Sequence, residues 1–129
     1  MDNIKELTVD ELRKFLNENE FKYQTAQTVL CFAIIKRLYE RLCLGYEFNC
    51  CIYVCRYRNI VVDGNHTYIS YLLAKKIFRE FEGTSSHSVI CSHYKTIKID
   101  EVNDWDDNSV RGMWYKSEKY LNSIKKVEF

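Results

Sequence analysis

The chain has 129 residues, of which 47% are hydrophobic and 15% aromatic, and its 19 basic and 18 acidic residues leave a formal net charge of +1. This composition indicates a folded domain rather than a disordered chain, and the balanced charge excludes a general attraction to nucleic acid or to an anionic membrane. No apolar run approaches the roughly 20 residues of a membrane span and the first residues lack the form of a signal peptide, so we expect one cytoplasmic domain over residues 1–129 without membrane contact.

The first part of the chain predicts two helices. Thr8 and Glu11 have the spacing of a capping box, which begins a short helix that runs to about Asn17. After a polar connection, a second helix is predicted over residues 25–44, because its centre is apolar on nearly every side. Gly45 ends this second helix.

Three stretches are typical of β-strands. Residues 48–57 and 60–62 are rich in β-branched and aromatic side chains, and Arg58-Asn59 joins them in a tight hairpin. Residues 88–94, with a short continuation at 97–99, form the last predicted strand.

A further helix is predicted over residues 66–81. Its apolar side chains recur at helical spacing, and we expect Ile69, Ile77 and Phe81 to face the core. The helix closes before Gly83.

The order of these elements predicts an α+β fold, in which a small mixed sheet is packed by helices. We assign the core to residues 1–104 and a C-terminal helical extension to residues 105–129. The extension contains an added helix over residues 109–124, which serves either as a cover for the sheet or as a partner surface.

The cysteine cluster Cys50-Cys51-x-x-x-Cys55 invites a zinc interpretation. In a strand, however, Cys50 and Cys51 face opposite sides, and Cys51 and Cys55 lie about 13 Å apart at roughly 3.3 Å per residue. Zinc requires its sulfur ligands within about 4 Å of one another. We therefore predict thiols and no metal here, and structural roles for His87 and His93, which have no partner at ligand spacing.

The most informative feature is the turn that follows the strand at residues 60–62. Asp63-Gly64 is a strong turn dipeptide, and Asn65 stands where the N-cap of the next helix belongs. The start of a helix presents unpaired N–H groups and the positive end of its dipole. Since His66 and Thr67 add donors, the turn is a candidate anion site.

The sequence Asp-Gly-Asn-His, which begins at Asp63, resembles the Asp-Gly-x-His-Arg turn of the ParB/sulfiredoxin-like superfamily, which includes ParB-like nuclease domains. The resemblance implies a small α+β domain that holds nucleotide or nucleic-acid phosphate on Gly64, Asn65, His66 and Thr67. It also implies His66 and Asp63 as catalytic residues in a phosphoryl-transfer or hydrolase reaction.

Two departures from the family turn change these expectations. Thr67 replaces the family arginine, which would bring a fixed charge and a bidentate fork for phosphate. Arg56, Arg58 or Lys95 are candidates to supply that charge. Asn65 stands where sulfiredoxins place their catalytic cysteine, which excludes sulfinic-acid repair.

Several residues carry a second interpretation. His66 is either a phosphate donor or general acid–base, because imidazole titrates near neutrality, or a helix-start residue hydrogen-bonded to the turn. Asp63 either binds a metal or transfers a proton in the reaction, or it is a carboxylate that forms the turn by bonding its own backbone. The acidic run at residues 100–107 is a solvated loop, a divalent-cation site or a mimic of DNA charge. The cofactor stays open, with Mg²⁺ as the candidate.

Two functions remain open. In the first, nucleotide or nucleic acid binds through phosphate at the turn from Asp63 to Thr67, with the chemistry given above. In the second, the chain is a catalytically inactive small inhibitor, or an immunity or anti-defence protein, which binds another protein through aromatic side chains such as its 10 tyrosines. Loss of the family arginine favours the second function, whereas the retained Asp63, Gly64 and His66 favour the first, which we adopt. The sequence leaves the oligomeric state open.

Overall fold

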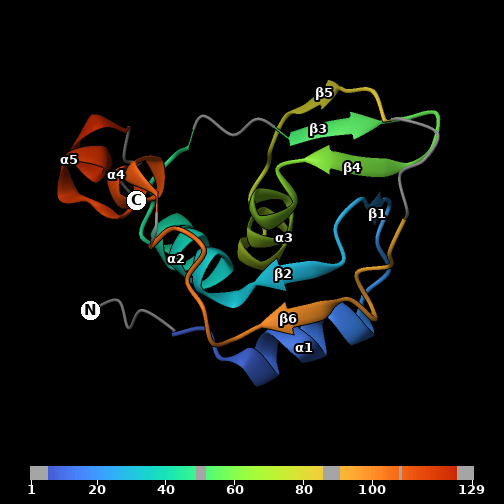
Figure 1. Cartoon of the computed structure of the whole chain (residues 1–129), viewed down its shortest axis with the longest axis horizontal. Helices are drawn as coiled ribbons and strands as arrows, with labels where there is room; N and C mark the ends of the chain where they lie inside the picture. Colours follow the sequence, from blue (N-terminus) through green and yellow to red (C-terminus); the bar gives the residue numbers. More distant parts are fainter. Residues whose placement is uncertain (1–5, 49–51, 86–90, 108, 125–129) are drawn as a thin grey trace.

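A computed structural model describes residues 6–48, 52–85, 91–107 and 109–124, and it has the α+β architecture that the sequence predicts (Figure 1). In chain order its elements are α1 (Val9–Glu18), β1 (Gln24–Thr25), β2 (Val29–Cys31), α2 (Phe32–Cys43), β3 (Ile52–Cys55), β4 (Ile60–Asp63), α3 (Asn65–Ala74), β5 (Glu80–Glu82), β6 (Lys98–Asp100), α4 (Val110–Lys116) and α5 (Glu118–Ser123).

The strands form two sheets. The larger sheet has the order β1-β4-β3-β5 and is mixed, because β3 and β4 are antiparallel while β1 and β5 run parallel to their neighbours. The smaller sheet pairs β2 with β6 in parallel. Helix α3 contacts both β3 and β2, so it lies between the two sheets (Figure 1).

The capping box of α1 is confirmed. The Thr8 hydroxyl accepts a hydrogen bond from the Glu11 N–H (3.1 Å), and the Glu11 carboxylate accepts one from the Thr8 N–H (3.2 Å). Leu12 and Leu16 on the inner face are fully buried. The helix ends at Glu18, one residue beyond the prediction.

The predicted helix over residues 25–44 is wrong in its first part. Val29–Cys31 form strand β2, and α2 begins only at Phe32. A short apolar run fits a buried strand as well as a buried helix, and here the pairing with β6 decides between them. The predicted end is confirmed, because Gly45 follows α2 with a left-handed φ of 95°.

The hairpin also differs from the prediction. Strand β3 covers Ile52–Cys55, and its turn spans residues 56–59 rather than Arg58-Asn59 alone, since Cys55 pairs with Ile60. Asn59 adopts a positive φ of 56° in this turn, a conformation that asparagine tolerates well. Cys50 and Cys51 lie outside the described residues, so the zinc prediction stays untested.

The third helix is shorter than predicted. Helix α3 ends at Ala74, where Lys75 takes a left-handed φ of 56°, and residues 80–82 form β5 beside β3. Consequently Ile77 and Phe81 do not face the core; Ile77 is 97% exposed. Apolar residues recur at helical spacing beyond Ala74, but the pairing of β5 with β3 requires an extended chain there, so the helix ends.

The predicted helix over residues 109–124 is two short helices. Ser117 separates α4 from α5 with extended backbone, and its hydroxyl accepts the Tyr120 N–H (3.2 Å) as the N-cap of α5. Gly112 is the one buried residue of α4, and α5 has none among the described residues. The helices lie at the end of the molecule beyond α2 (Figure 1).

The segment before β6 is less regular than a strand. His87 and the first part of the predicted strand at residues 88–94 lie outside the described residues. Ser92 forms an isolated bridge with Thr25, and regular pairing begins only at Lys98. None of the helices in the described part of the chain has the length and apolar character that crossing a bilayer requires.

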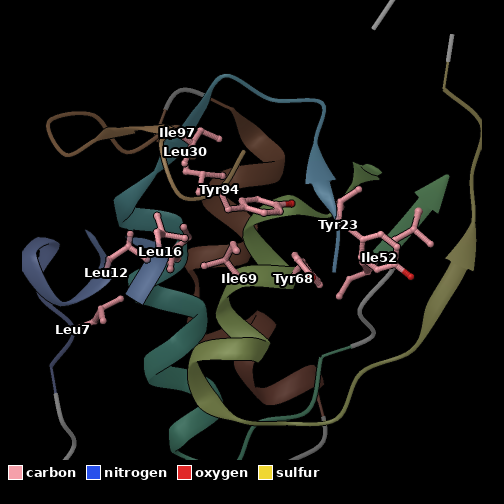
Figure 2. Packing of buried hydrophobic residues seen from close by; sticks show 13 residues of the cluster. Leu7, Leu12, Leu16, Tyr23, Leu30, Ile52, Tyr68, Ile69, Tyr94 and Ile97 are labelled. Atoms are coloured by element: carbon pink, nitrogen blue, oxygen red, sulfur yellow. The ribbon is translucent and has the colours of Figure 1, made fainter. Parts of the chain in front are cut away.

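The apolar core surrounds α3. Figure 2 shows Tyr94, Ile69 and Tyr68 between the leucines of α1 and the side chains of Tyr23 and Ile52. The Tyr94 side chain is 1% exposed, and Ile69 is fully buried. Because such packing fixes α3 on several sides, it also fixes the direction in which the start of this helix points.

Candidate functional site

Helix α3 begins at a glycine. Gly64 is the N-cap with a left-handed φ of 83°, and its carbonyl accepts the first helical hydrogen bond, from the Tyr68 N–H (2.8 Å). The prediction that Asn65 caps this helix is therefore wrong. A glycine suits this position because its lack of Cβ lets the chain turn sharply from β4 into α3. The N–H groups of residues 65–67 precede the helical hydrogen bonds and remain for an external acceptor.

The Asn65 side chain is a structural hub of the interior. Its Oδ1 accepts hydrogen bonds from the hydroxyls of Thr25 and Tyr94, each at 2.5 Å, and its Nδ2 donates to the Val61 carbonyl (3.4 Å). All of these groups are buried, and burial raises the pKa of Tyr94. The Asn65 side chain is thus committed to the fold, and only its backbone N–H can serve a ligand.

The His66 ring is held by the backbone of β2. Its Nε2 accepts a hydrogen bond from the Cys31 N–H (2.8 Å), and the edge of Trp105 packs on the ring with centroids 5.2 Å apart. Burial lowers the pKa of His66 from 6.5 to about 4, so the ring is neutral at pH 7 with its proton on Nδ1. A neutral ring with an occupied Nε2 fits the helix-start interpretation better than a general base.

Asp63 and Thr67 complete the turn. Asp63 is exposed, and its Oδ1 accepts a hydrogen bond from the N–H of the next residue, Gly64 (2.9 Å), so the carboxylate bonds to the backbone of its own turn. Thr67 is partly buried, in the first turn of α3.

A cavity of about 420 Å³ opens in front of this helix start. The predicted turn, from Asp63 to Thr67, lines one side. Helix α2 and the C-terminal segment, residues 104–124, line the others, with Phe48 and Tyr120 supplying aromatic surface. This volume lies within the range of sites that hold a small organic ligand.

Three arginines, none of them predicted for the site, line the same cavity: Arg37, Arg41 and Arg111. Arg37 is neutralised by Asp104 and Asp106, the latter at 2.8 Å. Arg111 is exposed, and its Nε donates to the hydroxyl of Tyr115 (3.0 Å). The cavity therefore holds more guanidinium groups than carboxylates.

Arg41 is held by polar and aromatic contacts. It is partly buried, its Nη1 donates to the Tyr115 carbonyl (2.7 Å), and its guanidinium lies 6.0 Å from the centre of the Tyr120 ring. No carboxylate in the described part of the chain forms an ion pair with it. Burial, and then the neighbouring Arg37, lower the pKa of Arg41. A desolvated cation of this kind is stabilised when an anion binds beside it.

The cations predicted for this role lie elsewhere. Arg56 and Lys95 form ion pairs with glutamates outside the cavity, and Arg58 lies beside Cys91. None of the three lines the cavity. These residues are close to the turn in sequence or in the predicted sheet, but that closeness does not bring their side chains to the cavity.

A usable signal was present in α2. Arg37 and Arg41 are four residues apart, so they share a face of any helix that contains them. Which element that face meets depends on how α2 packs on α3, and the sequence alone does not provide this. Arg111 gave no signal, since it reaches the cavity only through the fold of the C-terminal segment.

The acidic run begins with a loop closed by Asp100. Its carboxylate accepts hydrogen bonds from Trp105 Nε1 (2.8 Å) and from the backbone N–H groups of Asn103 and Val102 (both 3.1 Å). These bonds, that of Trp105 foremost, lower the pKa of Asp100 to about 2. They also hold Trp105 where it packs on His66.

The rest of the run attaches the C-terminal segment to α2. Asp104 and Asp106 both bind Arg37, while Lys116 binds Asp104 (3.4 Å) and Asp107. The interpretation as a simple solvated loop is therefore incomplete, because most of these carboxylates neutralise cations of the chain itself. Among the described residues, no group of three or more His, Cys, Asp or Glu side chains is placed to hold a metal ion.

No protein-family model matches this chain, and searches of curated proteins and of solved structures find no match. The ParB-like turn leads us to expect a small α+β domain with a mixed sheet. The structure shares that architecture.

Proposed function

We propose that this chain binds a phosphate-bearing ligand, a nucleotide or a nucleic-acid end, in the cavity at the start of α3. The phosphate lies on the backbone N–H groups of Asn65, His66 and Thr67, as in the ParB-like turn that the sequence resembles. Helix N-termini bind phosphate because their free N–H groups and dipole both favour negative charge.

The observation that carries this proposal is the pairing of Arg41 with that helix start in one cavity. The partly buried guanidinium of Arg41, which forms no ion pair with a carboxylate of the described residues, supplies the charge that Thr67 cannot. Arg111, exposed at the same cavity, adds a second cation. Two arginines from α2 and α4 would thus replace the single arginine of the family turn.

The size and lining of the cavity favour a nucleotide over inorganic phosphate. A volume of about 420 Å³ far exceeds a phosphate ion, and the rings of Phe48, Tyr115 and Tyr120 line the remaining space. Aromatic faces stack on bases of any sequence. The ligand therefore combines a phosphate group with a planar ring.

Binding is better supported than catalysis. The Nε2 of His66 is occupied by the Cys31 N–H, so this nitrogen cannot take a proton from a nucleophile without breaking a backbone contact. Asp63 remains the carboxylate nearest the proposed phosphate, and it would be the contact for a Mg²⁺ ion carried by the ligand. Phosphoryl transfer or hydrolysis at Asp63 and His66 is thus a secondary part of the proposal.

The test is thermal melting with nucleoside mono-, di- and triphosphates, short oligonucleotides and inorganic phosphate, each with and without Mg²⁺. A ligand at a hundred times its Kd stabilises the fold by about 2.7 kcal/mol, which raises Tm by several degrees. We expect a nucleotide to raise the Tm of the wild type and to do so much less in Arg111→Ala and Arg41→Met.

Arg56→Ala is the matched control, because it removes an exposed arginine that does not line the cavity. It should respond to the ligand like the wild type. His66→Ala is a poor test, since it also removes the acceptor of the Cys31 N–H. The proposal fails if no member of the panel shifts the wild type, or if the shift is the same in both cavity variants.

A second candidate function is a small inhibitor, or an immunity or anti-defence protein, that acts by binding another protein. Large apolar side chains on the C-terminal segment favour it: Val110 is 88% exposed and Met113 61% exposed, and Trp114 lies beside them on α4. These residues share a helix face by their spacing. Exposed apolar groups that gather in this way mark interaction surfaces.

This second function is tested with Val110→Ser and Met113→Ser. Both side chains are exposed, so the substitutions should leave Tm unchanged while weakening the capture of any partner that the wild type retains. Equal capture by wild type and both variants would contradict a role for this face.

A further inference from the structure

A second hollow lies at the opposite end of α3 from the proposed phosphate site. It has a volume of about 530 Å³ and is bounded by the residues after α2, by Tyr71 near the end of α3, and by the loop over residues 75–79 that leads to β5. Its apolar lining comes mainly from Tyr46, Phe48 and Phe78. We call it the α2–α3 groove.

The rim of this groove combines one exposed aliphatic side chain with several cations. Ile77 is 97% exposed, the highest value among the large apolar residues described. Lys75, Lys76 and Arg79 surround it in sequence and line the groove with it, against one carboxylate, Glu47. Neither Lys75 nor Arg79 forms an ion pair within the residues that the structure describes. The rim therefore has an excess of positive charge.

We propose that the α2–α3 groove binds an acidic protein segment, whose apolar side chain enters the hollow beside Ile77 and whose carboxylates meet Lys75 and Arg79. The charge of the rim selects an acidic partner, and an aromatic-lined hollow selects an inserted side chain. A flat anionic membrane offers no such side chain to fill the hollow. A phosphate backbone would leave Ile77 without an apolar contact and would meet Glu47.

This inference goes beyond the protein-binding face proposed on α4, because it names a different surface, and it does not depend on the phosphate site. The two surfaces are distinguishable by mutation, because Ile77 and Arg79 line only the groove, whereas Arg111 lines only the cavity.

The experiment uses the full chain and short fluorescent peptides in which a central Leu, Phe or Trp is flanked by Glu and Asp. We expect saturable binding in fluorescence anisotropy for at least one anchor. Ile77→Ser should raise its Kd about tenfold, which corresponds to about 1.4 kcal/mol. Arg79→Glu should raise Kd by a similar factor and flatten its dependence on salt.

Matched controls separate the groove from other surfaces. Val102→Ser removes an aliphatic side chain that is 87% exposed and does not line the groove, and Lys14→Glu reverses an exposed charge on α1; both should bind the peptide like the wild type. Arg111→Ala should also leave peptide binding unchanged. A peptide with Ser in place of the anchor should bind at least tenfold more weakly.

Several outcomes would overturn the inference: no saturable binding for any anchor, equal Kd values for Ile77→Ser and wild type, or equal binding of the peptide without an anchor. Tighter binding to phosphatidylserine vesicles or to an oligonucleotide, lost in Arg79→Glu, would assign the rim to that ligand instead. Loss of peptide binding in Val110→Ser but not in Ile77→Ser would overturn the inference and assign the peptide to the face of α4 described above.

Discussion

The two sides of the phosphate cavity are held in place by different forces. The side formed by α3 rests on an apolar core, with Ile69 fully buried and the Asn65 amide hydrogen-bonded to two buried hydroxyls. The side formed by the C-terminal segment buries little apolar surface and is attached through Arg37, through the backbone contact of Arg41 and through stacking of Tyr120 on Phe48.

This difference gives the two sides different stabilities. Burial of apolar surface contributes about 25 cal/mol per Å² and is not weakened by screening, whereas the ion pairs of Arg37 must offset the lost hydration of their charges, contribute about 1–2 kcal/mol and are partly screened by salt. We therefore expect the start of α3 to keep its geometry throughout, and the C-terminal segment to open first. The following predictions test this contrast, from the largest expected effect to the smallest.

Asn65→Ala should destabilise the fold by about 3 kcal/mol. It leaves the buried hydroxyls of Thr25 and Tyr94 without their acceptor, and unpaired buried groups are costly. Urea unfolding measures the change. Tyr94→Phe removes one donor and should cost less, and the double variant should lose less than the sum of the two. A loss below about 1 kcal/mol for Asn65→Ala would contradict its role as a hub.

The pKa of His66 should make the stability of the α3 side depend on pH. The pKa falls from 6.5 in the unfolded chain to about 4 in the fold, so the unfolded chain binds the extra proton between these values. The stabilisation is thus complete above about pH 6.5 and is lost as pH falls toward 4. We expect a loss of about 3 kcal/mol over this window.

Urea unfolding across that pH range provides the measurement. His66→Gln should remove this part of the dependence, while His93→Gln, at an exposed histidine, should retain it. The same slope in the wild type and His66→Gln would show that other groups cause it.

Arg37→Ala should loosen the C-terminal segment and destabilise the fold by about 1–2 kcal/mol, because the paired side chains are only 17–22% exposed while Lys116 still pairs with Asp104. It leaves Asp104 and Asp106 without their shared cation. Hydrogen exchange should become faster in α4 and α5 but not in α3. Lys36→Ala is the matched control, because Lys36 pairs with Glu40 on its own helix and with Glu6 near the start of the chain, and with no residue of the C-terminal segment that the structure describes. High salt should have a similar effect on the wild type, and unchanged exchange in both conditions would contradict the polar attachment.

Local signals explain which parts of this fold were predictable. The α1 capping box, the end of α2 at Gly45 and the strand–turn–helix at Asp63-Gly64 all depend on residues within a few positions of one another. Their geometry is set by hydrogen bonds and by φ preferences that a short sequence already contains.

The errors arose where distant segments compete with local preference. Val29–Cys31 became a strand because β6 pairs with it, and the chain after Ala74 left the helix because β5 pairs with β3. Asn65 has the residue type of an N-cap, yet its side chain turned inward to meet Thr25 and Tyr94. In each case a partner far along the chain outweighed the local propensity.

For the candidate site, the sequence by itself determined the turn, its left-handed glycine and the free N–H groups of the helix that follows, because these need only neighbouring residues. The tertiary structure alone decided which cations face that turn, since Arg41 and Arg111 come from α2 and α4 and converge only when α2 packs on α3 and the C-terminal segment attaches to α2. It also decided that His66 is neutral, because burial against Cys31 and Trp105 depends on β2 and on the loop closed by Asp100. Charge and solvation at a site depend on everything that surrounds it, and that surrounding is set by long-range packing.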